Sequence, residues 1–187
     1  MKLKAVEAIC KAKKNITVTG GPGEWWIGDA HSFYPVYELP ELNENIVFTI
    51  FDVPEDERGK WSYRWESVKG INLDDMDDTE RLVQADMLTV HIDGRMLAAI
   101  QTREHISFLD TAYLKPFKRG SYELYERVSN TGQVYFAVKS GFELIGVIAP
   151  YSLVRKDIAE KLERMACLCY QRLEVEEGKT EKEESEK

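Results

Sequence analysis

The segment from Leu88 to Pro150 constrains the fold most, because strand-like runs and turn residues alternate along its whole length. The runs LTVHI and MLAAIQT meet near Asp93-Gly94, a pair typical of the two-residue type I′ turn of a β-hairpin. Three later runs, YELYERV, GQVYFAVKSG and GFELIGVIAP, are separated by glycine-containing turns at 130–132 and 140–141. This order predicts a hairpin followed by a three-stranded antiparallel meander that ends at Pro150.

Helical patterns flank these strands. Apolar residues recur at helical spacing in the first 14 residues, at Leu3, Val6, Ile9 and Cys10. A second, short helix is expected from Asp110 or Thr111 to about Pro116, and the longest runs from Ser152 to about Leu173. The chain is therefore predicted to be an α+β protein, mainly antiparallel sheet, with helix–strand repeats and a long C-terminal helix packed on the sheet.

The length of 187 residues fits one domain with an insertion, or at most two small domains. We expect a single domain over 1–173, interrupted by an insertion at 32–86 that holds a short helix from Glu44 to Phe51. Residues 174–187 contain seven acidic residues and three lysines, so this acidic tail is expected to be disordered.

The stretch VTGGPGEWWIGD brings three glycines together and could be a phosphate-binding loop or a turn. The lysine of a Walker loop and the spacing of a dinucleotide-binding loop are both missing, and strand-like runs lie on either side. We interpret GGPG as a hairpin turn. Trp25 and Trp26 should then face opposite sides of the sheet, one in the core and the other covered, exposed or at an interface.

The charge distribution points to one class of partner. The chain has a net charge of −8 and a pI near 5.1, which argues against a broadly basic nucleic-acid-binding protein. Residues 1–14, however, hold five lysines and one glutamate, and YLKPFKRG adds three more cations. If the two segments share a face, they would contact DNA phosphates without reading bases. The candidate DNA-binding residues are Lys4, Lys11, Lys14, Lys115, Lys118 and Arg119.

The order of elements, with DTAYLKPFK at the second helix and GVIAP as the last strand, resembles one domain of the DNA polymerase sliding clamps. In that family, helices line the DNA-facing inner surface of a ring. The resemblance implies a clamp-like domain whose two basic helices face DNA and whose partners are replication proteins. The chain also resembles proteins of bacterial prophages and mobile elements, which implies mobile-element partners.

The run WSYRWE supports a second hypothesis. Alternation places Trp61, Tyr63 and Trp65 on one face of a strand, where they would be core residues or the contact surface of a protein-interaction module. This surface, or the long helix, could join copies of the chain into a homo-oligomer.

A third hypothesis is a small hydrolase in which Asp93 orients His91 on the same strand face. The chain lacks the usual hydrolase motifs, however, so no catalytic residue is assigned. The acidic run 72–80 lacks the glycine and spacing of a calcium loop, and we expect it to be a solvated loop that caps a short helix through Asp78 or Thr79. No metal site and no cofactor are expected.

Three cysteines, Cys10, Cys167 and Cys169, are too few for a disulfide framework. We expect reduced, at least partly buried cysteines in a cytoplasmic protein. The sequence shows no apolar run long enough for a signal peptide or a membrane span.

Overall fold

The computed structural model describes residues 2–21, 23–37, 39, 41–68, 70–83, 88–103, 106–151 and 156–185, with the side chains of 156, 159 and 174–185 left aside. The chain divides into two compact units, Met1–Tyr151 and Ser152–Lys187, and each is described by itself. The boundary of a single domain at residue 173 and the disordered tail at 174–187 stay predictions.

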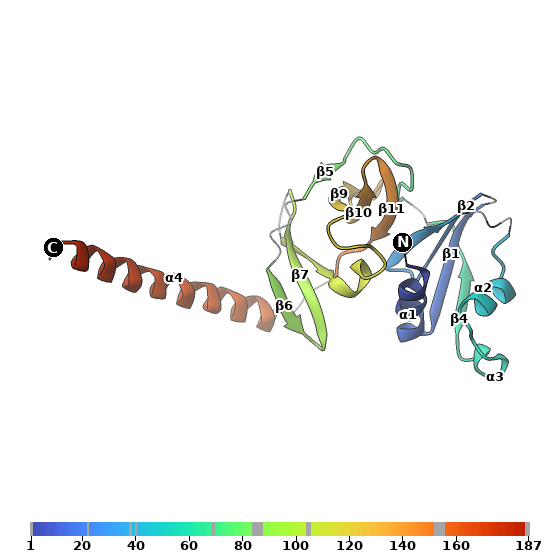
Figure 1. Cartoon of the computed structure of the whole chain (residues 1–187), viewed down its shortest axis with the longest axis horizontal. Helices are drawn as coiled ribbons and strands as arrows, with labels where there is room; N and C mark the ends of the chain where they lie inside the picture. The colour runs from blue at the N-terminus through green and yellow to red at the C-terminus, as the bar shows by residue number, and fades with distance from the viewer. Residues whose placement is uncertain are drawn as a thin grey trace. The chain divides into compact units, whose positions relative to one another are not determined.

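The first unit contains two β-sheets (Figure 1). The large sheet has eight strands in the order β4-β1-β2-β3-β11-β10-β9-β5, and the small sheet has three in the order β6-β7-β8. Their bounds are β1 Asn15–Gly21, β2 Glu24–Gly28, β3 Ser32–Val36, β4 Ser62–Trp65, β5 Arg81–Leu82, β6 Thr89–Ile92, β7 Arg95–Gln101, β8 Ile106–Asp110, β9 Glu123–Val128, β10 Val134–Ser140 and β11 Glu143–Ile148. Among these strands β1 and β4 pair in parallel, and the other recorded pairs are antiparallel.

The helices of this unit are α1 Leu3–Lys13, α2 Glu44–Ile50, α3 Glu55–Arg58 and the 3₁₀ helix η1 Thr111–Leu114. The predicted α+β class with mostly antiparallel sheet is confirmed. The second short helix lies where it was expected, and the Asp110 side chain caps it by accepting from the Ala112 N–H at 2.9 Å. It is a 3₁₀ turn of four residues, shorter than expected.

The two predicted β-structures of the second half are confirmed. β6 and β7 form the hairpin, with Asp93 at φ 51° and Gly94 at φ 75°, as a type I′ turn requires. β9, β10 and β11 form the antiparallel meander. The sequence identifies both correctly because their turns need residues that tolerate positive φ.

The glycine-rich stretch is a hairpin turn between β1 and β2, as predicted, with Gly21 opposite Glu24. Gly20 has φ 97°, and a Cβ there would lie 2.0 Å from the Glu24 carbonyl oxygen, so a side chain cannot be accommodated. Trp25 and Trp26 are both buried, on opposite faces of the sheet.

The large sheet therefore has a core on each face. The larger core joins α1, α2, η1 and the small sheet, through residues such as Val6, Phe48, Tyr113 and Leu109. The smaller core, around Trp26, lies on the other face and is covered by apolar residues of the loop before β5: Val68, Ile71 and Leu73.

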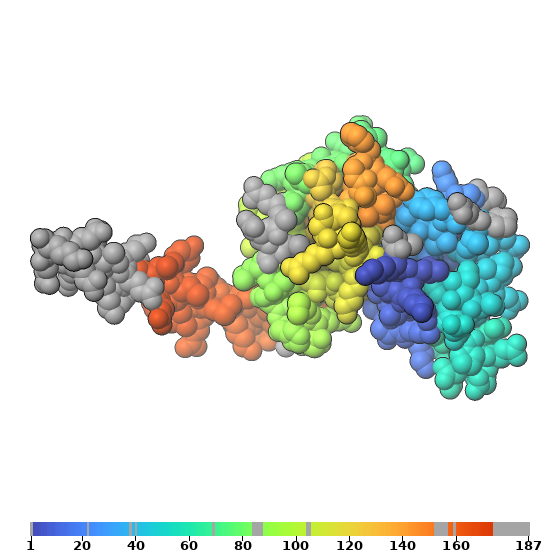
Figure 2. Space-filling model, in the orientation of Figure 1, coloured from blue at the N-terminus to red at the C-terminus, as the bar shows by residue number. Residues whose placement is uncertain are grey.

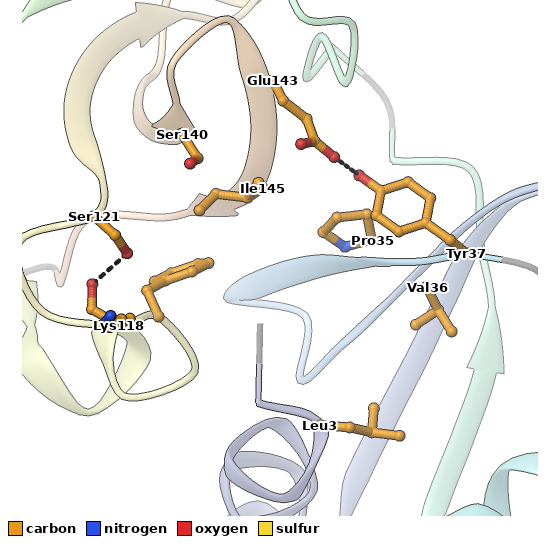
Figure 3. A pocket seen from close by; sticks show the side chains of 10 residues that line it. Leu3, Pro35, Val36, Tyr37, Lys118, Ser121, Ser140, Glu143 and Ile145 are labelled. Atoms are coloured by element: carbon orange, nitrogen blue, oxygen red, sulfur yellow. Dashed lines mark hydrogen bonds between the residues drawn. The ribbon is translucent and has the colours of Figure 1, made fainter.

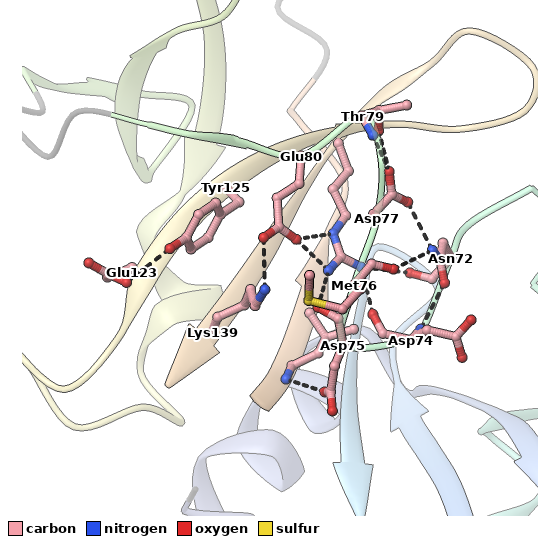
Figure 4. Close-up of polar contacts among 12 residues, drawn as sticks. Asn72, Asp74, Asp75, Met76, Asp77, Thr79, Glu80, Glu123, Tyr125 and Lys139 are labelled. Atoms are coloured by element: carbon pink, nitrogen blue, oxygen red, sulfur yellow. Dashed lines mark hydrogen bonds and ion pairs between the residues drawn. The ribbon is translucent and has the colours of Figure 1, made fainter. Parts of the chain in front are cut away.

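The end of that loop, residues 72–80, differs from its prediction as a solvated, helix-capping segment. Arg127 of β9 is fully buried, and its guanidinium donates to the carbonyl oxygens of Asp74 and Asp75 at 2.9 Å. The same guanidinium contacts the Glu80 carboxylate at 2.5 Å, and that carboxylate also accepts from Lys139 at 2.7 Å (Figure 4). The loop is therefore fixed by hydrogen bonds and ion pairs to buried cations. Strand β5 follows it in place of the expected helix.

The stretch predicted as an insertion, 32–86, supplies β3, β4 and β5 to the large sheet. Its predicted helix is confirmed as α2, which begins after Asn43, whose side chain accepts from the Ile46 N–H at 3.0 Å.

The second unit contains the long C-terminal helix α4, Lys156–Ser185, which includes residues 174–185 of the expected disordered tail. Its packing on the sheet stays a prediction. Cys167 and Cys169 are exposed on this helix, which corrects the expectation of partial burial, whereas Cys10 is buried. Within the described part of the chain, no helix has the length and apolar character needed to cross a membrane.

Candidate nucleic-acid interface

The two basic segments of the sequence are neighbours. The Lys2 N–H, just before α1, donates to the Pro116 carbonyl oxygen at 2.8 Å. At the other end of α1, the Lys13 ammonium donates to the Tyr113 hydroxyl at 2.6 Å. Figure 2 shows the dark-blue N-terminal segment and the yellow segment side by side on one face. Both ends of helix α1 are thus hydrogen-bonded to the η1 segment.

A buried carboxylate holds this junction together. The Asp29 side chain is inaccessible to solvent and lies 2.7 Å from the Lys13 ammonium and 2.9 Å from the Tyr113 hydroxyl. Its other oxygen accepts from the backbone N–H groups of His31 and Ser32, each at 3.0 Å. Asp29 therefore ties α1, the β2–β3 turn and η1 together.

The environment of Asp29 stabilises its charge. Burial by itself raises the pKa of Asp29, but the hydrogen bond and charge of Lys13 and the Tyr113 hydroxyl together hold it below its ordinary value. Burial and the Asp29 charge raise the pKa of the Tyr113 hydroxyl. Burial, followed by Asp29, also raises the pKa of Cys10, which keeps this thiol protonated. The cluster is a structural junction formed by a charged carboxylate.

The candidate DNA-binding side chains are all exposed, but they are not equivalent. Lys11 forms an ion pair with Glu7 one helical turn earlier, so its charge is partly compensated. The structure records no ion pair, among the residues it describes, for Lys4, Lys14, Lys115, Lys118 and Arg119. We call these five side chains the basic surface.

Sequence reasoning did not identify Asp29 and Tyr113 as the residues that position the basic surface. A single aspartate 16 residues from Lys13 carries no periodic signal, and the contact with Tyr113 spans 84 residues. The only signal in the sequence for a role of Asp29 is its place at the end of a strand-like run, where turn residues are common.

The aromatic row divides into two environments. Trp61 and Tyr63 are half-buried against Phe48 of α2, with ring centroids 6.2 and 6.4 Å away, and the Tyr63 hydroxyl donates to the Leu42 carbonyl oxygen at 3.0 Å. Trp65, at the end of the edge strand β4, is 67% exposed. Only Trp65 of the three thus presents most of its ring to solvent.

The hydrolase candidates do not both lie on the strand that was expected to carry them. His91 lies exposed on β6, and Asp93 lies in the hairpin turn with positive φ. Across the described residues, no group of three or more histidine, cysteine, aspartate and glutamate side chains is arranged to hold a metal ion.

Comparisons with protein-family models, with curated proteins and with solved structures found no match to this chain.

Proposed function

We propose that this protein binds DNA through the sugar–phosphate backbone, using the basic surface, and that its first unit works as a clamp-like accessory domain. The observation that carries the proposal is the hydrogen bond from Lys2 to Pro116, because two cationic segments more than 100 residues apart in the chain lie next to each other there. Uncompensated lysine and arginine side chains on one face attract phosphates and release counterions on binding.

The remainder of the surface limits this binding. A chain with a net charge of −8 repels DNA everywhere except at a local excess of cations. Binding is therefore confined to the basic surface, is independent of base sequence and falls steeply with salt. The resemblance to sliding clamps supports a role beside replication or mobile-element proteins, since α1 and η1 would be the helices that face DNA.

The test is fluorescence anisotropy with a labelled 20-base-pair duplex between 50 and 200 mM salt. With up to five phosphate contacts, the affinity should fall by roughly 10²–10³-fold over this range. The double variant Lys115→Glu, Lys118→Glu should weaken binding and lower the salt slope by about 2.

The matched control is Arg81→Glu, which reverses an exposed arginine on β5, at the opposite edge of the large sheet from β4 and β1. This variant should bind within about twofold of the wild type, because it reverses a charge outside the basic surface and salt screens exposed charges that do not contact the phosphates. Equal effects of the two charge reversals, or binding that is insensitive to salt, would contradict the proposal.

The exposed Trp65 on edge strand β4 favours a second candidate function, a protein-interaction module that joins two copies of the chain. Sedimentation velocity at rising protein concentration would then show association that Trp65→Ala abolishes. Met76→Ala, which removes another largely exposed apolar side chain, is the control and should leave association unchanged. A monomer at all concentrations excludes this candidate.

A further inference from the structure

A pocket of about 560 Å³ opens beside the basic surface (Figure 3). Leu3 of α1 and Lys118 of the segment after η1 both line it, so it adjoins both basic segments. Its apolar wall includes Val36, Phe117 and Ile145. The volume lies in the range of ordinary small-molecule sites.

The pocket lies where two neighbouring strands of the large sheet separate. β3 and β11 pair only at Phe33–Val147 and Ser32–Ile148, although both strands continue beyond these pairs. The next-but-one residue of β3 is Pro35, which has no N–H to donate to a neighbouring strand. Pro35 lines the opening that this interruption leaves.

The aromatic wall of the pocket is held in place by packing within the protein. The ring of Phe117 packs between Tyr34 and Tyr122, with centroids 5.6 and 5.5 Å away. Gly146 makes room for it, since a Cβ at this position would lie 2.5 Å from Phe117 Cζ. Phe117 is 5% exposed, so its ring is held in place as part of the wall.

The polar groups on the rim are separated by charge. Lys118 lies on one side of the opening, and Glu143, which accepts from the Tyr37 hydroxyl at 2.8 Å, lies on the other (Figure 3). A phosphate is attracted by the ammonium and repelled by the carboxylate. A nucleobase has an apolar face for the wall and N–H donors that a carboxylate, which only accepts, can bind.

We propose that this pocket takes one unstacked nucleotide of single-stranded DNA, with the base against the apolar wall and its phosphate at Lys118. The inference rests on the proposed DNA binding and adds a preference for single strands, because a base paired in a duplex cannot enter the pocket. The basic surface holds the phosphates on either side.

The test uses Ser140→Trp, which fills the pocket from its exposed rim without changing the charge. With labelled single-stranded and duplex 20-mers at fixed salt, this variant should lose about tenfold in affinity for the single strand, the effect of losing one stacked base. Its affinity for the duplex and its salt slope should not change. Ser67→Trp, at an exposed serine outside the pocket, is the control and should bind both forms as the wild type does.

A second measurement uses the wild-type protein, so it does not depend on how a variant folds. Single-stranded DNA carrying 5-iodouracil is photo-crosslinked and the modified peptide identified by mass spectrometry. Crosslinks at Phe117 or Tyr37 support the proposal, whereas crosslinks confined to Trp65 or other aromatic residues overturn it.

The outcomes separate this inference from the proposed function. If Ser140→Trp binds both DNA forms as the wild type does while Lys115→Glu, Lys118→Glu weakens both, the basic surface binds DNA and the nucleotide pocket is wrong. A protein segment then becomes the expected occupant. If the wild type binds neither form, the proposed function fails and the pocket inference fails with it.

Discussion

The acidic loop 72–80 and the basic surface both look like solvated charge runs in the sequence, but they have opposite roles in the structure. In the acidic loop, Glu80 points toward the buried Arg127 and Lys139, and Asp75 accepts from the Leu144 N–H at 2.7 Å. On the basic surface, the cations remain exposed, and the buried charge of this region is Asp29, which pairs with the half-buried Lys13. A charge run can therefore stabilise the fold or remain available for a partner, and only its contacts distinguish the two.

The largest effect should come from the acidic loop. Glu80→Ala would leave Arg127 and Lys139 buried without their shared carboxylate, and removing one partner of a buried ion pair costs about 3–5 kcal/mol. Urea denaturation followed by circular dichroism measures the change in the free energy of unfolding.

Asp78→Ala is the matched control, because Asp78 is an exposed acid of the same loop. It should change stability by no more than about 0.5 kcal/mol. If the two variants unfolded at the same denaturant concentration, the loop would be the solvated segment that the sequence suggested. Glu80→Gln, which keeps the shape of the side chain, serves if Glu80→Ala does not fold.

A smaller effect is expected at the junction beneath the basic surface. Asp29→Asn keeps an oxygen for the backbone N–H groups of His31 and Ser32 but removes the charge facing Lys13, which should cost about 2 kcal/mol at neutral pH. Thermal or urea denaturation at pH 7 provides the measurement.

The pH dependence checks the cause of this effect. The folded-state pKa of Asp29 is lower than its unfolded value, so its charge stabilises the protein above about pH 3.9, the ordinary aspartate pKa. That contribution is lost as the pH falls through the lowered folded-state value. The difference between wild type and Asp29→Asn should thus be constant above about pH 5 and shrink below pH 4. A difference that persists unchanged to pH 2 would show that the ionised carboxylate is not its source.

Local signals determined the parts of the fold that depend on neighbouring residues. The turn at Asp93-Gly94, the cap at Asp110 and the apolar stripe of α1 are each set by residues within one or two turns of chain. Backbone dihedral preferences, capping and periodicity act over such distances, so these elements could be predicted from the sequence. The cationic side chains of the basic surface could also be picked out from the sequence, because positive charge is clustered in few other places. They are Lys4, Lys14, Lys115, Lys118 and Arg119.

The sequence by itself therefore determined an α+β chain with antiparallel hairpins and two cationic segments. Tertiary structure decided that the acidic loop closes over Arg127 and that Asp29 joins Lys13 to Tyr113. It also decided that β3 and β11 separate near Pro35 and leave a pocket. The physical reason is that a buried charge is stable only with a partner and a strand only with a hydrogen-bonded neighbour, and the fold supplies these partners from 16 to more than 100 residues away in the chain.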